Sequence, residues 1–318
     1  MSRQGHEIAV FGATGYAGQV LVRLLEAHPT LSPRAISART PASWTPADRA
    51  TVETASAVAL ALPAEASKTW APVLWEHTKA PVVDLSDAFR TSPGVPYGIF
   101  ELWPEPIAGA RLVANPGCYP TATLLALAPL LSHGLVAPDT IAVVGKSGAS
   151  GAGKKVAEHL QFCELAGNSF PYNVGRHRHI REIEHHLGAP VCFVTELLPI
   201  VRGLSVTAFV RPTCEPAALH HALCEAYEAH PYVHVLDAPD ARLGLRHVVG
   251  THDARIAVGP VTASGLVPVF CSIDNLMRGA ASAALVALNR QHGLAPHAGL
   301  AAPVPPGPAL PGMKAAWT

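Results

Sequence analysis

The sequence predicts an α/β fold, with a parallel-sheet domain first and an α+β domain with a mixed or antiparallel sheet after it. Three observations favour this fold. Short apolar segments alternate with helical patterns up to residue 119. A glycine-rich turn directly follows the first of these segments. Beyond residue 190 the apolar segments are longer and are typical of strands in a mixed sheet.

Five short apolar segments are expected as strands of the first sheet, at residues 7–11, 34–37, 56–63, 80–86 and 110–116. Apolar residues at helical spacing follow the first segment, between Val20 and Leu25. Strands that are separated by helices form a parallel sheet, and the helices cover both of its faces. The first part of the chain is therefore expected to be a parallel sheet between two layers of helices.

The later part of the chain has a different pattern. Residues 140–148 predict a strand that enters a glycine-rich loop, and longer strands are expected within 190–210 and 265–274. A helix is expected over 274–292, because small residues line one face and Gly293 lies beyond its end. The tail from residue 295 is rich in proline and alanine, and we expect it to lie extended on the surface or to be disordered.

Composition excludes several kinds of partner. The chain has 318 residues, a formal net charge of zero and only 14% charged residues, which disfavours nucleic acid and an anionic membrane surface. It has no run of 18 apolar residues and no secretory signal, so neither a membrane span nor export is expected. The six cysteines form no CxxC pair, and we expect reduced thiols in a cytoplasmic protein.

The turn after the first strand carries Gly12, Gly15 and Gly18, and a helix follows it. Such a turn lets a pyrophosphate approach the backbone and the free N–H groups of the helix, which predicts a Rossmann-type dinucleotide site. An acidic residue at the end of the second strand would favour NAD. Ser37 and Arg39 stand there, and a hydroxyl and a guanidinium suit the 2′-phosphate of NADP. The alternative is that Arg39 is an ordinary solvated loop charge.

A second glycine-rich loop runs from Gly148 to Lys155 and nearly matches the phosphate-loop pattern. Lys155 occupies the position where that pattern needs Ser or Thr, so the hydroxyl that binds magnesium is missing and a nucleoside triphosphatase is disfavoured. The loop, with Lys146 and Ser147 before it, could still bind a phosphate group of a substrate. The alternative is a flexible turn between strand and helix.

Cys118 follows the turn signal Asn115-Pro116-Gly117, and Pro120 suits the first turn of the helix that is expected next. The thiol thus lies at a helix N-terminus and at the carboxyl end of a parallel strand, where a thiolate is favoured and ligands bind. Beside a nicotinamide cofactor, a thiolate can form a thioester that hydride reduces to an aldehyde. The alternative is an inert, half-buried thiol. The other five cysteines are expected to be structural.

This chemistry also needs an acid/base, for which His177 and His179 are the candidates. They precede an amphipathic helix on which His185 and His186 are expected at the surface. The alternative for the pair is a basic, solvated loop. The histidine spacing does not suit a metal pair and no cysteine or carboxylate cluster completes one, so no metal site is expected.

Nine segments form a recognisable set, namely GATGYAG (12–18), LALP (60–63), DLSDAFR (84–90), YGIFEL (97–102), ARLVANPGCYPTA (110–122), GKSGASGAG (145–153), NVGRHRHIREI (173–183), PIVRG (199–203) and DNLMRGAA (274–281). They cover nearly the whole chain except its tail. In this order the chain resembles the N-acetyl-gamma-glutamyl-phosphate reductase family of arginine biosynthesis, within the aspartate-semialdehyde-dehydrogenase-like superfamily.

The resemblance implies a role for individual residues. Cys118 would be the nucleophile that displaces phosphate from the acyl-phosphate substrate and carries the thioacyl intermediate. His179 would be the acid/base, with His177 next to it at the substrate as the second candidate for that role. The phosphate and carboxylate of the substrate would be bound by Arg90, Lys146, Ser147 and Arg202. The cofactor NADP would be held by Gly12, Thr14, Gly15, Tyr16 and Ala17 at the pyrophosphate, Ser37 and Arg39 at the 2′-phosphate, Pro63 at the adenosine and Asn275 near the nicotinamide.

The resemblance also implies an NADP-binding domain over residues 1–119, completed by 275–318, and a catalytic and oligomerisation domain over 120–274. A homodimer or homotetramer would form through the sheet of the second domain. The chain departs from the family pattern in three places. Residues 39–55 are short, which would trim one strand–helix unit of the nucleotide domain, and the segment after Arg90 is abbreviated. Arg181 stands where the family often has proline.

Rival functions stay open at this point. Aspartyl phosphate or a carrier-linked aminoadipyl phosphate could be the substrate, although the segment NPGCYPT favours the glutamyl over the aspartyl family. A non-catalytic NADP-binding regulator would keep the fold without a reactive thiol. A phosphate-loop kinase would bind ATP with magnesium.

Overall fold

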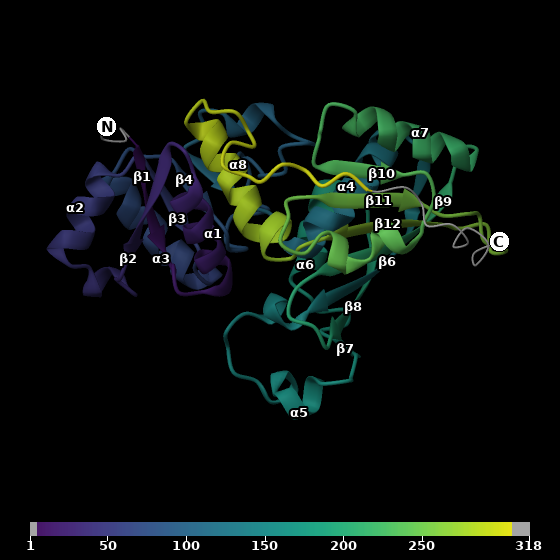
Figure 1. Cartoon of the computed structure of the whole chain (residues 1–318), viewed down its shortest axis with the longest axis horizontal. Helices are drawn as coiled ribbons and strands as arrows, with labels where there is room; N and C mark the ends of the chain where they lie inside the picture. The colour runs from purple at the N-terminus through teal and green to yellow at the C-terminus, as the bar shows by residue number, and fades with distance from the viewer. Residues whose placement is uncertain (1–4, 307–318) are drawn as a thin grey trace. The chain divides into compact units, whose positions relative to one another are not determined.

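The computed structural model describes residues 5–306, which form two compact units (Figure 1). Unit 1 contains the described residues up to Gly117 together with Ala280–Ala301. Unit 2 contains Cys118–Gly279 and the described residues from Ala302 on. The chain therefore passes between the units within a few residues of the positions 119 and 275 that the sequence suggests, and residues 302–306 lie with unit 2.

Unit 1 contains a parallel sheet of five strands within the described residues, in the order β2-β1-β3-β4-β5. The strands are β1 (His6–Phe11), β2 (Leu31–Ile36), β3 (Ala57–Leu60), β4 (Val82–Asp84) and β5 (Leu112–Ala114). Each strand overlaps one of the five segments that the sequence predicts. The predicted parallel sheet is thus confirmed.

Two apolar cores cover the two faces of this sheet, because successive strand residues point to opposite faces. Ile8 and Val10 pack with α1 and α8, whereas Ala9 and Phe11 pack with α2 and α3. The helices are α1 (Tyr16–Ala27), α2 (Pro46–Thr54), α3 (Ala64–His77) and α8 (Ser282–Gln291). The short stretch between β2 and β3 therefore still contains a complete helix, α2.

Unit 2 contains a mixed sheet with the strand order β10-β11-β12-β9-β6-β8-β7. The strands are β6 (Val136–Gly148), β7 (Phe170–Tyr172), β8 (Cys192–Leu198), β9 (Leu204–Pro212), β10 (Val233–Leu236), β11 (Ala254–Val258) and β12 (Val267–Ile273). β6 pairs with β8 and β10 pairs with β11 in parallel, and the other neighbours are antiparallel. This confirms the predicted mixed sheet.

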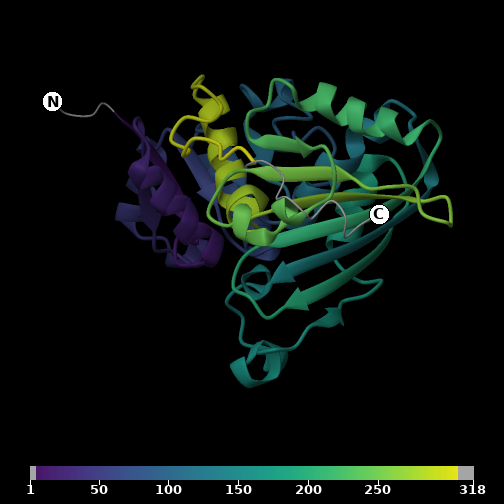
Figure 2. The same ribbon diagram turned by 45° about the vertical axis from the view of Figure 1, so that its right-hand side comes forward.

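The helix α4 (Cys118–Ser132) is the centre of unit 2. It contacts β6, β9 and β12 and also the helices α6 (His179–Leu187) and α7 (Pro216–Tyr227). Nearly its whole surface is buried, which explains why apolar residues occupy all of its sides. A long loop that carries α5 (Phe162–Leu165) projects from the sheet (Figure 1). Figure 2 shows the strands of this sheet broadside.

The last helix begins later than the sequence predicts. Residues Met277–Ala281 form a π-helical turn, and the regular helix α8 starts only at Ser282. The π-helical turn places Gly279 directly against Cys118, since a Cβ added at Gly279 would lie 2.5 Å from the Cβ of Cys118. The backbone N–H of Gly279 donates to the carbonyl of Asp274 at 2.9 Å, which fixes the turn against the thiol residue.

The described part of the tail has no regular secondary structure. In unit 1, the Asn289 side chain donates to the carbonyls of Pro296 and Ala298, both at 2.9 Å. In unit 2, the N–H of Val304 donates to the carboxylate of Asp253 at 3.0 Å. Residues 296–299 form turns, residues 302–306 have no regular secondary structure, and residues 307–318 of the predicted tail lie outside the described residues. No helix among residues 5–306 has the length and apolarity to cross a membrane.

Candidate active site

The glycine turn after β1 is built so that side chains would not fit. Gly12 has a φ of +71°, and a Cβ there would run into the carbonyl of Ala61 after β3. A Cβ at Gly18 would run into the carbonyl of Gly12. The N–H of Gly15 donates to the Gly12 carbonyl at 3.0 Å and Gly15 is the N-cap residue of α1. The backbone is thus folded back tightly where the sequence predicts a pyrophosphate.

The same turn leaves the start of α1 ready for an anion. No side chain among the described residues caps this helix N-terminus, so its first N–H groups can bind phosphate oxygens. Thr14, Tyr16 and Ala17 belong to this turn and first helical residues. Pro63 is the N-cap residue of α3, directly after β3, the neighbour of β1 in the sheet. The residues present therefore fit a dinucleotide at the carboxyl ends of these strands.

Ser37 and Arg39 follow β2, and both are exposed. The Ser37 hydroxyl donates to the carboxylate of Asp48 in α2 at 3.1 Å. Burial raises the pKa of Asp48, but hydrogen bonds from Thr45 and Ser37 outweigh burial, so the pKa lies below its ordinary value. Asp48 was not among the residues predicted from the sequence. The segment Thr45-Pro46-Ala47-Asp48, a helix start with an acidic third residue, could have indicated it.

Cys118 is the first residue of α4 and is half-buried. Only Asn115, Pro116 and Gly117 separate it from the end of β5. This confirms the predicted position of the thiol at a helix N-terminus after a parallel strand. The other cysteines of the chain are also free thiols, and Cys271 is fully buried in β12, where burial raises its pKa to about 12.

Asn115 and Arg90 hold the end of β5 in unit 1. The N–H of Asn115 donates to the carbonyl of Asp84 at 2.8 Å, and its side chain donates to the carbonyl of Ala280 at 3.1 Å. The guanidinium of Arg90 donates to the carbonyls of Asn115 and Leu85, at 2.8 and 2.9 Å. Arg90 is buried and thus supports the backbone that leads to Cys118.

The ring of Tyr119, the residue that follows Cys118, lies close to the rings of both histidines. This ring lies against the backbone of Gly145, where an added Cβ would meet the ring at 2.5 Å. The same ring is 5.6 Å from the His177 ring and 6.0 Å from the His179 ring, measured between centroids. Unit 2 therefore gathers Cys118, Tyr119, His177 and His179 in one place.

The two histidines are differently placed. His179 is the first residue of α6 and only 4% exposed. Its backbone N–H donates to Nδ1 of His177 at 3.2 Å. Burial, together with the charge of Arg178, lowers the pKa of His177 to about 4. His177 is therefore a neutral ring at neutral pH, with Nδ1 as an acceptor.

Tyr172 is a further member of this cluster that the sequence analysis missed. Its hydroxyl lies 3.2 Å from the hydroxyl of Tyr119. Burial raises the pKa of Tyr172 to about 12 and also raises the pKa of Tyr119, and the charge of Cys118 adds to both shifts. Both phenols are thus neutral donors close to the thiol. Tyr119 stands beside Cys118 in the motif and could have been singled out, but the position of Tyr172 depends on long-range strand pairing.

The predicted substrate ligands of unit 2 do not all lie on one side of its sheet. Ser147 is buried in β6, on the face that α4 covers, whereas Lys146 is exposed on the opposite face and pairs with Glu196 at 3.3 Å. Arg202 forms an ion pair of 3.1 Å with the fully buried Asp274. Asn275 is buried as well, in the segment that follows β12.

Asn275 connects the loops around this cluster. Its side-chain oxygen accepts from the N–H of Gly203 at 2.8 Å, and its side-chain nitrogen donates to Ser150 at 3.0 Å. The N–H groups of Gly148, Ala149 and Ser150 donate to carbonyls of residues 200–203. These three backbone donors are therefore used within the protein, and the start of the second glycine-rich loop is held against residues 200–203.

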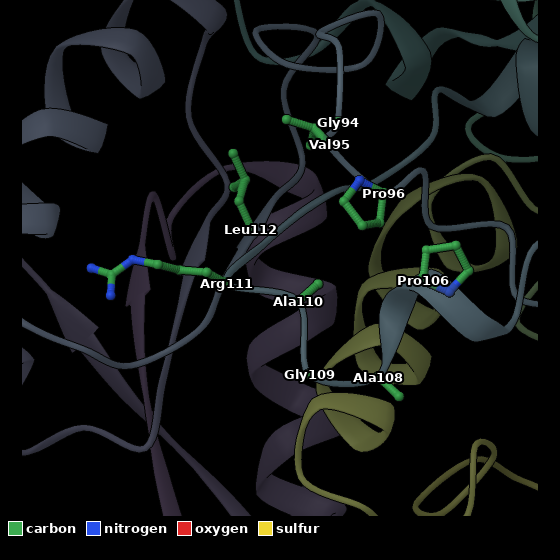
Figure 3. A pocket seen from close by; sticks show the side chains of 9 residues that line it. All are labelled: Gly94, Val95, Pro96, Pro106, Ala108, Gly109, Ala110, Arg111 and Leu112. Atoms are coloured by element: carbon green, nitrogen blue, oxygen red, sulfur yellow. The ribbon is translucent and has the colours of Figure 1, made fainter.

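A cavity of about 410 Å³ lies in unit 1, between residues 94–96 and 106–112 (Figure 3). The Arg111 side chain points away from it and lies over the Trp75 ring at 5.0 Å. Arg111 stands at the amino end of β5, whereas the glycine turn lies at the carboxyl ends of the strands. The cavity thus lies at the amino ends of the strands, whereas the residues predicted to bind the nucleotide lie at the carboxyl ends. No residue predicted for the reaction lines the cavity.

Two family models match the chain. The semialdehyde dehydrogenase NAD-binding domain matches residues 7–110, and the semialdehyde dehydrogenase dimerisation domain matches residues 118–275. Together they cover the two units described above. The chain is therefore a semialdehyde dehydrogenase by both of its domains.

Similar proteins agree with these matches. An N-acetyl-gamma-glutamyl-phosphate reductase of Desulforudis audaxviator is 35% identical over 93% of this chain and 98% of its own length. One from an Arthrobacter species is 37% identical over 92% and 97%. Among solved structures, aspartate semialdehyde dehydrogenase II of Vibrio cholerae, in complex with ASA, has a TM-score of 0.72 at 19% identity, over 90% of this chain and 98% of that one. The chain thus belongs to the N-acetyl-gamma-glutamyl-phosphate reductase family of the semialdehyde dehydrogenases.

Proposed function

We propose that this protein reduces N-acetyl-gamma-glutamyl phosphate to N-acetylglutamate semialdehyde with NADPH, as a step of arginine biosynthesis. The observation that carries the proposal is the position of Cys118 at the start of the buried helix α4, next in the chain to Tyr119, whose ring lies 5.6 and 6.0 Å from the rings of His177 and His179. The family of the chain supplies the substrate class.

The Cys118 thiolate attacks the acyl carbon of the substrate and forms the C–S bond, and inorganic phosphate leaves with the electron pair of the broken acyl C–O bond. The product of this step is a thioester on Sγ. A bound nicotinamide dinucleotide supplies the hydride that reduces the thioester carbon. Expulsion of the thiolate from the reduced carbon then releases the aldehyde and restores the free thiolate.

His179 is proposed as the acid that donates a proton to the oxygen on which negative charge develops. His177 is the weaker candidate, since its pKa of about 4 leaves almost none of it protonated at neutral pH. A neutral His177 with Nδ1 engaged by the His179 N–H presents Nε2–H as a donor, which suits substrate binding. Tyr119 and Tyr172 add two neutral hydroxyls to the same cluster, one of which donates to the other.

Ser147 and Arg202 are the better supported of the proposed substrate ligands. Ser147 lies on the α4 side of the sheet, and Arg202 is oriented by its ion pair with Asp274. Lys146 forms an ion pair with Glu196 on the face of the sheet that points away from α4. The Arg90 guanidinium donates to backbone carbonyls of unit 1. These two residues could reach a substrate only by giving up the contacts that they now make.

The dinucleotide is proposed to bind with its pyrophosphate at Gly12, Thr14, Gly15, Tyr16 and Ala17. Arg39 supplies a cation for a 2′-phosphate, which supports NADPH, and Ser37 lies beside it. Pro63 borders the adenosine from the end of β3. Asn275 is proposed to approach the nicotinamide; its side chain is held by Gly203 and Ser150, so its orientation is fixed.

A homodimer or homotetramer is proposed through the face of the unit 2 sheet that points away from α4. Val144, Val194, Phe209 and Phe270 alternate with buried neighbours along their strands and are half-buried. The family model of this unit is named a dimerisation domain. Sedimentation of the chain as a monomer at micromolar concentration would contradict this assembly. A cytoplasmic location is proposed on the six free thiols.

The function is tested with a panel of aldehydes in the reverse direction. N-acetylglutamate semialdehyde, aspartate semialdehyde and a carrier-linked aminoadipate semialdehyde are each supplied with NADP and phosphate, and NADPH formation is followed by absorbance. The expected result is phosphate-dependent turnover with the first aldehyde, lost by several orders of magnitude in Cys118→Ser, which still binds NADP. Equal or faster turnover with either other aldehyde contradicts the proposed substrate.

A further inference from the structure

Asp48 stands beside the residues that the sequence assigns to the adenosine end of the cofactor. It is 8% exposed and belongs to the first turn of α2. The Ser37 hydroxyl donates to one carboxylate oxygen at 3.1 Å, and the Ser37 N–H donates to the other at 3.3 Å. The Thr45 hydroxyl donates to the same carboxylate at 2.9 Å. The carboxylate is thus ordered at the end of β2.

This contact changes what Ser37 can offer to a ligand. A hydroxyl has one proton, and here it is directed to Asp48. Ser37 then presents only lone pairs, which can accept from the 2′-hydroxyl of a ribose. A 2′-phosphate acts as a hydrogen-bond acceptor at neutral pH. Ser37 has no proton left to donate to it, and the Asp48 carboxylate behind Ser37 repels it.

The neighbouring backbone does not replace the missing donor. The N–H groups of Arg39 and Thr40 both donate to the hydroxyl of Ser43, at 3.1 Å each. The guanidinium of Arg49 lies over the Trp44 ring at 5.3 Å. The exposed side chain of Arg39 is therefore the main attraction that this segment offers to a 2′-phosphate.

We propose that Asp48 is a specificity-determining residue that opposes the 2′-phosphate and favours the ribose hydroxyl, so that the protein binds NADH almost as well as NADPH. Like charges at close range cost binding free energy, whereas Arg39 favours the phosphate, and the two effects largely offset each other. The inference rests on the proposed function only in that a nicotinamide dinucleotide binds at the glycine turn.

The test is a binding measurement that needs no turnover. The full chain is titrated with NADPH and with NADH, and the nicotinamide fluorescence gives a Kd for each at fixed ionic strength. In the unmodified chain the two values are expected within about tenfold of each other. Asp48→Asn is expected to tighten NADPH about tenfold and to leave NADH nearly unchanged, because only NADPH carries a 2′-phosphate that the Asp48 charge would repel. Arg39→Met is expected to weaken NADPH alone.

Two further variants make the result specific. Glu53→Gln removes one charge from the same helix α2 without touching Ser37, and it is expected to change neither Kd. Ser37→Ala tests the claim even if Asp48→Asn does not fold, and its NADPH affinity is expected to stay within about twofold, because the hydroxyl proton is not available to the phosphate.

Three results would overturn the inference. They are a preference for NADPH above about a hundredfold in the unmodified chain, an unchanged NADPH to NADH ratio in folded Asp48→Asn, and a tenfold loss of NADPH affinity in Ser37→Ala. Binding of neither dinucleotide to the unmodified chain contradicts the proposed function itself, and the inference falls with it. Dinucleotide binding without turnover contradicts only the proposed reaction, and the Kd values still decide the role of Asp48.

Discussion

At the scale of single residues, the cluster around Cys118 is defined by burial as much as by residue type. Tyr119 contacts Gly145, both histidines and Tyr172, so that polar rings gather around the residue next to Cys118, on a helix that is largely apolar. Enclosed rings are poorly hydrated, which keeps His177 neutral and keeps both phenols protonated. Each can then donate a hydrogen bond without bringing a charge beside the thiolate.

The neutral state of His177 has a consequence for stability. Its pKa falls from 6.5 to about 4 on folding, so below pH 6.5 the unfolded chain binds a proton that the folded chain does not. The free energy of unfolding therefore decreases as the pH falls from 6.5 towards 4, and this contribution is absent above that range. His177→Gln is expected to lose less stability between pH 7 and pH 5 than the unmodified chain.

Chemical denaturation at both pH values measures this difference. His221→Gln changes an exposed histidine and is the matched control, expected to behave like the unmodified chain. His28 and His292 also have pKa values lowered by burial, so part of the acid sensitivity stays in every variant. An equal loss of stability in His177→Gln and the control would show that His177 is not held neutral by the fold.

The residues predicted from sequence were those whose chemistry is local. Cys118 was placed from a turn signal and a proline, and Gly12 from its position after a strand; both lie where the structure needs them. Asp48 and Tyr172 were missed, because each depends on a contact between segments that are not adjacent in the chain. The face on which Lys146 lies depends on the strand register of β6 and likewise becomes visible only in the structure.

At the scale of elements, the start of the last helix shows how packing overrides propensity. Five of the residues at 274–281 (one Leu, one Met, one Arg and two Ala) are good helix formers, and a regular helix was predicted from there. The chain instead makes a π-helical turn over Met277–Ala281, with Gly279 directly against Cys118. Such widened turns are common at functional sites, where they shift one residue out of the regular helical path.

Gly279→Ala is expected to displace the thiol. The added methyl group would meet the Cβ of Cys118 at 2.5 Å and its Cα at 2.9 Å, and neither is the flexible end of a side chain. We expect a loss of stability of about 1–3 kcal/mol and a larger loss of turnover. The rate at which iodoacetamide alkylates Cys118 is expected to change as well, because the added methyl group would displace the Cα and Cβ of that residue.

Ala280→Gly is the matched control for Gly279→Ala, since it changes a methyl group in the same turn without adding a contact at Cys118. It is expected to keep the alkylation rate. Intact-mass spectrometry over a time course measures both variants. Unchanged alkylation and turnover in Gly279→Ala would mean that the turn does not position the thiol.

At the scale of the whole molecule, the sequence predicted both sheets and their type. Short strands that alternate with helices led to the parallel sheet of unit 1, and longer strands led to the mixed sheet of unit 2. The strand order of unit 2 was not predicted, because β6 pairs with β8 and β9, which are distant in sequence. Residues 302–306 lie with unit 2, a contact between the tail and Asp253 that has no sequence signal.

The division of labour between the two units follows from this architecture. Unit 1 contains the turn that fits a dinucleotide, and unit 2 contains the thiol, the histidines and Arg202. The chain enters unit 2 at Cys118 itself, so the proposed nucleophile is the first residue of unit 2 and follows the end of β5 after Asn115, Pro116 and Gly117. The proposed reaction therefore requires that the Cys118 sulfur first binds the acyl group of the substrate and then holds it where hydride from the cofactor reaches the thioester carbon.

The most direct measurement of this claim is the mass of the protein after incubation with N-acetylglutamate semialdehyde and NADP in the absence of phosphate. We expect one N-acetylglutamyl group on Cys118, formed with one NADPH per chain, and its release when phosphate is added. The Cys118→Ser variant should gain no such mass. Steady NADPH formation without a modified Cys118, or the acyl group on another residue, would contradict the proposed mechanism.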